Sequence, residues 1–377
     1  MNLVRLLRPV VIKELRQIRR DPTSLGMLLG LPALLIVFVG FALNFDVKHV
    51  PLLIFDQNKT GESRAFLEKF KNSEYFDYQG DVSGYGEIES SFLHSRARIA
   101  VVVPVRFGQE LLAGRNVEVQ ILVDGTDANT AGQAVVNASR LTVEYSTRIT
   151  LAAYQRRGGT EFLPVDFEPR VWYNPDLISS RYLVPGLIGF ILVLTAVVST
   201  SMTVVREKER GTMEQIMVSP LRPIQVIIGK TIPYLLISLI AATMILILGY
   251  LLFDISVRGS LFVLYSGIFI IIVGALGQGL LISTVTDSQQ VAFMISVFSS
   301  LLPSFLLSGF VFPVANMPVV LQVLSYLAVN KYFLVVVRGV MLKGVGFAAV
   351  WDQFALMGLF AAVMLGVSIA RMRKQSV

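Results

Sequence analysis

The chain has 377 residues, of which 54% are hydrophobic and only 16% are charged, and its mean hydropathy is +0.65. Soluble globular proteins carry about 25% charged residues, so this composition excludes a chain that is water-soluble along its whole length. The sequence contains no cysteine, which excludes a disulfide framework, a thiolate metal site and a cysteine nucleophile. The net charge of +7 is concentrated in segments beside apolar runs, and we therefore predict no nucleic-acid partner.

The first 21 residues have the pattern of an amphipathic helix that lies in the plane of a membrane surface. Apolar residues at helical spacing are Leu3, Leu7, Val10, Val11, Leu15 and Ile18, and the arginines of another face are Arg5, Arg8, Arg16 and Arg19. Pro9 either kinks this helix or marks its start. A generic positively charged anchor is an equally good interpretation and is compatible with the first.

Six uncharged intervals between charged residues are long enough to cross a membrane, which takes roughly 20 apolar residues. Five of them contain 18 to 28 residues, and each is predicted to hold one transmembrane helix. They lie between Asp21 and Asp46, Arg181 and Arg206, Lys230 and Asp254, Arg258 and Asp287, and Asp352 and Arg371. The sixth interval, from Asp287 to Lys331, has 43 uncharged residues and three prolines, which predicts one span followed by an irregular segment.

Basic residues mark the predicted cytoplasmic side, because cytoplasmic loops carry an excess of Lys and Arg. They cluster before the first span, directly after the second and after the last. These three segments share one side only if the number of spans is even, so we predict six spans with both termini in the cytoplasm. The segment from about 313 to 350 is then a re-entrant excursion, with Tyr332–Val340 as its returning limb. A secretory signal in place of the first span is disfavoured, because the apolar run exceeds the usual length of about 7–15 residues.

The segment 46–181 is predicted to be an α/β domain outside the cytoplasm. It holds 18 of the 26 acidic residues and both histidines. Apolar runs predict strands at Val50–Phe55, Ile99–Val105 and Val117–Val123, with helical patterns between them and a long helix from Ala128 to about Arg157. Strands that alternate with helices indicate an α/β fold.

The sequence lacks the motifs that would power transport or catalyse a reaction. No phosphate-binding loop of the form G-x-x-x-x-G-K-[ST] occurs, and no carboxylate or lysine lies inside a predicted span, where it would indicate an ion or proton relay. The glycines of Gly274–Gly279 fall within a span, where small residues let helices approach closely. We predict no catalytic residue, no cofactor site and no metal site in this chain, so energy for transport must come from another subunit.

The segment 206–223, with the sequence REKERGTMEQIMVSPLRP, connects the second and third spans on the cytoplasmic side. Its charges alternate in sign, Gly211 and Thr212 supply a hinge and a helix cap, and an apolar strip follows before Pro220. Such a short amphipathic helix can fit a groove on a soluble partner. An ordinary solvated connection is the alternative for this segment taken alone.

Three motifs together resemble one known family. EKERGTMEQIMVSPLRP followed by GKTIPYLL resembles the signature of ABC-2 type permeases, the membrane subunits of a class of ATP-binding-cassette exporters. NPDLISSRYLVPG (Asn174–Gly186) resembles the entry to the family's second span, and LLPSFLLSGFVFPVANMP (Leu301–Pro318) resembles its fifth span and the start of its re-entrant segment. One departure is Val329–Phe333, which lacks the proline that often precedes the Tyr-Phe pair.

The resemblance implies an N-terminal interfacial helix (1–21), a first span (22–45), the external domain (46–181), a second span (182–205), a coupling segment (206–223) and four further spans (224–377). It also implies that two permeases, either two copies or a pair of paralogues, assemble with two cytoplasmic ATPase subunits that bind ATP and Mg²⁺. The coupling residues that it implies are Glu207, Glu209, Arg210, Gly211, Thr212 and Glu214. Membrane lipids and a periplasmic adaptor protein are the other expected partners.

We expect a permease of the bacterial inner membrane that exports an amphiphilic substrate, either drug-like or lipid-like. Candidate pathway-lining hydroxyls in the second and fifth spans are Thr195, Ser199, Thr203, Ser300, Ser304 and Ser308. The alternative for them is hydrogen bonding to their own helix. Two other classes of function are alternatives. One is a membrane-anchored sensor whose external domain binds a ligand without transport. The other is an intramembrane enzyme, for which the sequence shows no converging polar groups.

Overall fold

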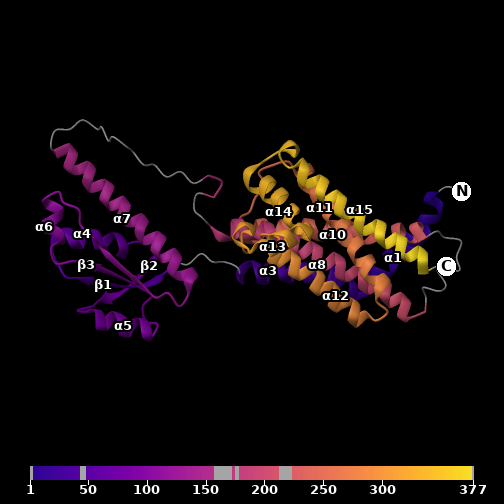
Figure 1. Cartoon of the computed structure of the whole chain (residues 1–377), viewed down its shortest axis with the longest axis horizontal. Coiled ribbons are helices and arrows are strands. Elements are labelled where there is room, and N and C mark those ends of the chain that lie inside the picture. The colour runs from indigo at the N-terminus through magenta and orange to yellow at the C-terminus, as the bar shows by residue number, and fades with distance from the viewer. Residues whose placement is uncertain (1–2, 43–47, 157–171, 175–177, 212–222, 376–377) are drawn as a thin grey trace. The chain divides into compact units, whose positions relative to one another are not determined.

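In a computed structural model the chain forms two compact units, shown in Figure 1. The helical unit comprises Met1–Asn44 and Val171–Val377, and the α/β unit comprises Phe45–Arg170. The structure describes all residues except 1–2, 43–47, 157–171, 175–177, 212–222 and 376–377. The α/β unit has bounds close to those of the segment 46–181, which the sequence predicts to be a separate domain.

The α/β unit is built around a four-stranded sheet with the order β2-β1-β3-β4. Its elements are β1 (Val50–Asp56), α4 (Gly61–Lys71), β2 (Phe76–Asp81), α5 (Tyr85–Leu93), β3 (Ile99–Val103), α6 (Phe107–Leu112), β4 (Gln120–Val123) and α7 (Ala128–Arg156). β1 is parallel to β2 and β3, and β4 is antiparallel to β3. Phe66 and Phe70 of α4 and Ala134 of α7 pack on one face of the sheet, and Ile88 of α5 packs on the other.

Sequence patterns located the two central strands of this sheet and part of the edge strand β4, but not the other edge strand, β2. The runs at Val50–Phe55 and Ile99–Val105 form β1 and β3, whereas the run Val117–Val123 is a strand only in its second half. β2, with the sequence FDYQGD, escaped prediction because most of its side chains are exposed at the edge of the sheet. An edge strand with one buried residue at its start has no apolar run to detect.

Five helices among the described residues are long and apolar enough to cross a membrane. They are α8 (Ser179–Glu209), α10 (Pro223–Phe253), α11 (Leu261–Val285), α12 (Gln289–Leu302) continued by the π-helix η2 (Pro303–Leu307), and α15 (Trp351–Gln375). A shorter apolar helix, Gly26–Ala42, consists of the π-helix η1 (Gly26–Gly30) and α3 (Leu31–Ala42). The predicted end of this first span lies outside the described residues. The helical unit therefore has the composition of a protein that crosses a membrane several times.

The remaining helical elements lie at the two ends of this bundle. They are α1 (Leu3–Arg20), α2 (Pro22–Leu25), η3 (Val314–Asn316), α13 (Val319–Leu324), η4 (Ser325–Leu327), α14 (Val329–Arg338), η5 (Gly339–Lys343) and η6 (Phe347–Ala349). Pro9 lies inside α1 and does not mark its start. The helix pair Val319–Leu327 and Val329–Lys343 is bent by 83°, a geometry shared by broken spans and re-entrant loops.

Helix α8 is the central element of the bundle. It packs against α3, α10, α11, α12 and α14, and almost all of its apolar stretch is buried. Small residues permit this close packing: a Cβ added at Gly189 would meet Asn330 and Phe333 of α14, and one added at Gly279 of α11 would lie 2.7 Å from the carbonyl oxygen of Val197. The glycines of α11 thus allow close helix approach, as the sequence indicates. Neighbouring helices therefore cover α8 along its apolar stretch.

The fifth apolar helix changes its winding at a proline and then ends in a tight turn. Pro303 lacks a backbone N–H and begins the π-helix η2. Gly309 has φ +82°, a left-handed conformation that favours glycine. The guanidinium of Arg338 in α14 donates to the carbonyl oxygens of Gly309 and Phe310, at 3.3 and 3.1 Å, and to that of Tyr182 at 3.3 Å. Arg338 therefore ties the turn to α8 and to the bent helix pair.

Candidate functional site

The candidate site lies at the end of α8 that leads into the predicted coupling segment. The predicted span ends at residue 205, whereas α8 continues as one helix to Glu209. Gly211 follows with φ +70°, and its N–H donates to the carbonyl oxygen of Lys208, as at many helix C-termini. No break separates the predicted span from Arg206–Glu209, so these residues belong to the same helix as the buried centre of the bundle.

Four charged side chains from three helices form a network at this end, which we call the ion cluster: Lys13 and Glu14 of α1, Glu207 of α8 and Lys230 of α10. Lys13 Nζ lies 2.5 Å from Glu207 Oε1 and 3.3 Å from Glu14 Oε1. Lys230 Nζ donates to Glu207 Oε2 and lies 3.4 Å from Glu14 Oε1. The cluster links helices that are far apart in the sequence and is electrically neutral when all four groups are charged.

Three of the four members are deeply buried: Glu14 is 0%, Lys230 3% and Glu207 4% exposed. Removing such charges from water is costly, so they depend on one another. Desolvation of the half-exposed Lys13 ammonium opposes its charge, but the hydrogen bond to Glu207 and the negative charges of Glu14 and Glu207 outweigh this and raise the pKa of Lys13. Glu14 Oε2 has no hydrogen-bond partner in the described part of the chain. One acceptor therefore remains unused next to two ammonium groups.

A second set of contacts ties the same end of α8 to other elements. Arg206 Nη1 lies 2.5 Å from Asp21 Oδ2, and Arg206 Nε donates to Gln289 of α12 at 3.1 Å. Glu209 accepts from the backbone N–H of Gln289 at 2.7 Å and from its side chain. Lys208 Nζ donates to the carbonyl oxygen of Thr286 at 3.2 Å. The end of α8 is thus fixed to α1, to α10 and to the connection between α11 and α12.

The predicted coupling residues are not equivalent in the structure. Glu207 is buried in the ion cluster, so its carboxylate is turned away from any soluble partner. Glu209, Arg210 and Gly211 are exposed. Thr212 and Glu214 lie outside the described residues. A direct contact with another subunit is therefore open to Glu209, Arg210 and Gly211, whereas Glu207 can act on it only through the other helices.

The predicted pathway hydroxyls are buried between helices of this single chain: Thr195, Ser199, Thr203, Ser300, Ser304 and Ser308 are all at most 6% exposed. Thr195 and Ser308 donate to carbonyl oxygens of their own helical segments, those of Ile191 and Ser304. Thr203 accepts from the Tyr234 hydroxyl at 2.8 Å. The hydroxyls of Ser199 and Ser300 have no partner among the described residues.

One cavity brings some of these polar groups together. It has a volume of about 250 Å³ and is lined by residues of α8, α11, α12, η2 and α15 and by Leu327–Val329, and Gln278, Ser299 and Ser304 supply its polar groups. Gln278 Nε2 donates to Ser299 Oγ at 3.2 Å. Ser304 also belongs to the predicted pathway set. The amide and the hydroxyls give this mostly apolar cavity a polar side.

The ion cluster was not found from the sequence, although one signal was available. The charge pattern predicts span ends, one helix face and a coupling segment, but it does not indicate which charges pair across helices. Glu14 follows Val10 and precedes Ile18 at i+4 spacing, which places a carboxylate on the apolar face of an amphipathic helix. Among the described residues, no group of three or more His, Asp or Glu side chains is arranged to hold a metal ion.

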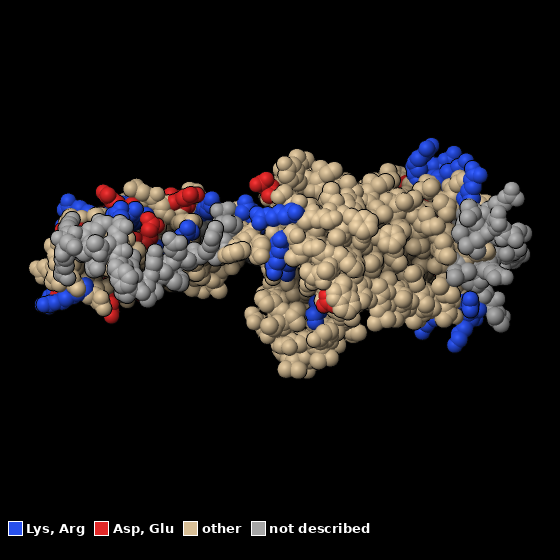
Figure 2. Space-filling view, turned by 90° about the horizontal axis from the view of Figure 1, so that it is seen from above, with Lys and Arg blue, Asp and Glu red and all other residues tan. Residues whose placement is uncertain are grey.

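Charge is unevenly distributed over the helical unit. Figure 2 shows Lys and Arg side chains gathered at the end where α15 terminates, and beside them a belt free of charged side chains on the face in view. Exposed basic residues from α1 and from the end of α15 are Arg8, Arg16, Arg19, Arg20, Arg371, Arg373 and Lys374. An apolar belt bordered by basic residues is the pattern of a multi-pass membrane protein.

A bundle of apolar helices, with an α/β unit inserted after the first and a buried ion cluster at one end, is the architecture of a polytopic membrane protein. The sequence profile described as "ABC-2 family transporter protein" matches residues 22–370, and the chain belongs to this family. The resemblance found in the sequence motifs is thereby confirmed.

Three relatives from Escherichia coli (strain K12) are similar over nearly the full length. "Probable multidrug ABC transporter permease YbhS" is 30% identical over 90% of this chain and 89% of its own length. "Probable multidrug ABC transporter permease YbhR" is 30% identical over 97% of this chain and 98% of its own. "Inner membrane transport permease YhhJ" is 23% identical over 96% of each chain. All three names describe permease components.

Proposed function

We propose that this chain is the permease subunit of an exporter that moves an amphiphilic, drug-like or lipid-like substrate out of the cytoplasm or the inner leaflet. ATP is hydrolysed by a separate cytoplasmic subunit, two of which pair with two permeases. Support comes from the family match over residues 22–370 and from relatives named as multidrug permeases. A periplasmic adaptor is a further partner in this proposal.

The proposed orientation places both chain termini and the ion cluster in or next to the cytoplasm. Gly26–Ala42 acts as the first of six spans, and the bent pair Val319–Leu327 and Val329–Lys343 acts as a re-entrant segment. The basic end seen in Figure 2 supports this orientation. The α/β unit then lies outside the cytoplasm, and the protein resides in the bacterial inner membrane.

The observation that carries the coupling mechanism is the continuous helix from the buried centre of the bundle to the exposed Glu209. We propose that the ATPase subunit contacts the exposed residues after Lys208 and moves α8. The ion cluster transmits that motion to α1 and α10, because its four charges cannot separate into a low-dielectric interior without cost. The unused acceptor on Glu14 lets an ammonium group change partners while it stays paired.

The substrate pathway is proposed to involve α8 and α12. The polar side of the 250 Å³ cavity, formed by Gln278, Ser299 and Ser304, can hold a polar group of an amphiphile while the apolar wall contacts the rest. The hydroxyls of Ser199 and Ser300, which have no partner among the described residues, can bond to substrate when the helices repack. Rigid-body motion of α8 against α12 would open this route in turn to each side.

Reversing the charge of Arg210 tests the proposed contact. Arg210→Glu is expected to weaken association with the ATPase subunit about tenfold, equivalent to about 1.4 kcal/mol, because it changes an exposed charge at the edge of the contact. Arg371→Glu, which changes an exposed cation of α15, serves as the matched control. Equal binding of the ATPase subunit by the Arg210→Glu variant and the unaltered chain would remove Arg210 from the interface.

A second candidate function is a sensor that uses the α/β unit to bind a ligand. It is favoured by a cavity of about 460 Å³ whose lining includes Phe66, Phe107 and Tyr145, a size within the range of small-molecule sites. Ligand binding to the full chain without any ligand-stimulated ATP hydrolysis by the assembled complex would favour the sensor over the exporter.

A further inference from the structure

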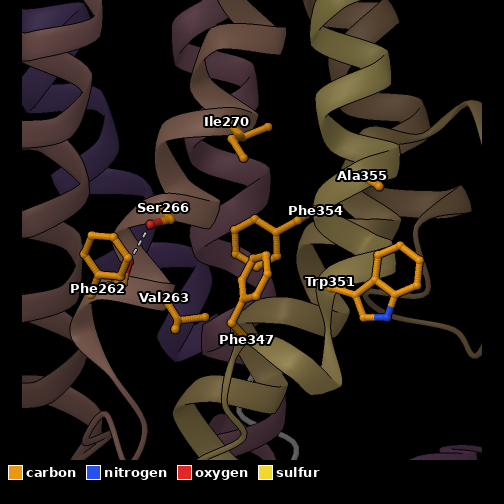
Figure 3. A pocket seen from close by; sticks show the side chains of 8 residues that line it. All are labelled: Phe262, Val263, Ser266, Ile270, Phe347, Trp351, Phe354 and Ala355. Atoms are coloured by element: carbon orange, nitrogen blue, oxygen red, sulfur yellow. Dashed lines mark hydrogen bonds between the residues drawn. The ribbon is translucent and has the colours of Figure 1, made fainter.

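A groove on the surface of the helical unit lies between the first turns of α11 and α15. Figure 3 shows Phe262, Val263, Ser266 and Ile270 of α11 on one side, and Trp351, Phe354 and Ala355 of α15 on the other, with Phe347 between them. Its volume is about 660 Å³, within the range of ligand sites. The groove lies at the end of the bundle opposite the ion cluster.

The walls of this groove are apolar and partly aromatic. Phe354 is buried, and its ring centroid lies 5.1 Å from that of Phe347. The hydroxyl of Ser266 donates a hydrogen bond to the carbonyl oxygen of Phe262 at 2.7 Å, as the dashed line in Figure 3 shows. Its proton is therefore not available to a ligand in the groove. Phe262 is 82% and Trp351 60% exposed. An exposed tryptophan at the end of a span is typical of the membrane interface.

The backbone segments that carry two cations, Arg258 and Lys343, lie side by side at the same end. The backbone N–H of Arg258 donates to the carbonyl oxygen of Met341 at 3.2 Å, which holds the chain before α11 against η5, the segment that ends at Lys343. Both side chains are exposed, and neither forms an ion pair with any described residue, although Lys343 Nζ lies 5.9 Å from the Tyr173 ring centroid. Asp352, next to Trp351, is also exposed.

We propose that this groove binds one acyl chain of a zwitterionic phospholipid. The phosphate of the lipid contacts Arg258 and Lys343, and the ammonium group of the lipid lies toward Asp352. The apolar walls suit a hydrocarbon chain, and the exposed charges of both signs complement a phosphoethanolamine head group. This lipid belongs to the leaflet at the end where α11 and α15 begin, the outer leaflet in the proposed orientation.

Fluorescence quenching of Trp351 tests this site directly. The chain has two tryptophans, so Trp172→Phe leaves Trp351 as the only one, beside the groove. The protein is placed in phosphatidylcholine nanodiscs that contain a small fraction of either brominated phosphatidylethanolamine or brominated diacylglycerol, which lacks the phosphate. We expect the phospholipid to be preferred about tenfold over diacylglycerol, as one charge-assisted contact provides.

Two pairs of variants separate the site from general lipid contact. Ala355→Phe fills the groove and is expected to abolish the preference. Ala362→Phe adds the same side chain at an exposed position seven residues, or about two turns, further along α15, and is expected to keep it. Arg258→Gln with Lys343→Gln is also expected to abolish the preference, whereas Arg371→Gln at the other end of the bundle is not.

Three results would overturn the proposal. Equal quenching by the two brominated lipids in the unaltered groove would exclude selection by the phosphate. An unchanged preference in Arg258→Gln/Lys343→Gln would exclude the head-group contact, and these exposed positions carry little risk to folding. Loss of association between two copies of the chain in Ala355→Phe, with lipid preference unchanged, would make the groove a protein interface. The measurement needs no ATPase subunit, so its failure is distinct from failure of the transport proposal.

Discussion

Replacing Glu207 by leucine is expected to lower the free energy of unfolding of the helical unit by about 3–5 kcal/mol. The reason is that Lys230, only 3% exposed, would lose the carboxylate to which it donates and would keep only Glu14 at 3.4 Å. Lys13 would lose its 2.5 Å contact as well. Thermal unfolding of the purified chain in detergent measures this loss.

The double variant Glu207→Leu/Lys230→Leu separates stability from coupling. Removing both partners leaves Lys13 and Glu14 paired at 3.3 Å and puts apolar side chains in contact, a change that is often neutral or stabilising. We expect the free energy of unfolding of the double variant to exceed that of the single variant by roughly 2 kcal/mol or more. If the ion cluster transmits motion, the double variant will regain stability and still bind the ATPase subunit, but it will transport little substrate per ATP hydrolysed. Normal transport by the double variant would assign the cluster a purely structural role.

Replacing Arg338 by leucine is expected to destabilise the helical unit by about 3 kcal/mol or more. Hydrogen bonds to charged groups contribute roughly 1.5–3 kcal/mol each, and Arg338 donates to the carbonyl oxygens of Tyr182, Gly309 and Phe310. Its guanidinium also stacks on the Tyr182 ring, 3.7 Å from the centroid. Loss of these contacts frees the turn after η2, so transport should fall together with the unfolding temperature.

Arg338→Lys provides a graded comparison, because lysine keeps the charge but lacks the planar fork that reaches several carbonyls. We expect an intermediate loss of stability. Lys343→Leu, an exposed cation five residues further along the same segment, should change stability by less than about 0.5 kcal/mol. If Arg338→Leu unfolded at the same temperature as Lys343→Leu, the turn would be held by packing alone.

Apolar runs made most of the helical unit predictable. A span leaves a long uncharged interval in the sequence, and α8, α10, α11, α12 and α15 all fall on such intervals. Element ends were less predictable, because Lys230 bounds an uncharged interval but lies two turns inside α10, which starts at Pro223. Lys230 is covered by neighbouring helices and paired with Glu207, so its charge does not end the helix.

The candidate site was predictable only in part. The segment 206–223 is predicted to be a coupling segment from its charges and its motif, and this stays a prediction; among its described residues, Glu209 and Arg210 are exposed. The pairing of Glu14 with Lys230 could not be read from the sequence, because 216 residues separate them and only the packing of α1 on α10 brings them together. An ion pair between two helices forms only where the charged faces of those helices pack together. The sequence shows which residues share a helix face, but it does not show which helix packs against that face.

ATP hydrolysis and substrate efflux in proteoliposomes, measured with the chain alone and with its cytoplasmic ATPase subunit, distinguish a passive permease from a self-powered protein. We expect no hydrolysis above that of empty vesicles from the chain alone, and efflux only when the ATPase subunit and ATP are both present. Hydrolysis by the chain alone, or efflux in the absence of the ATPase subunit, would contradict the proposal that another subunit supplies the energy for transport through the end of α8.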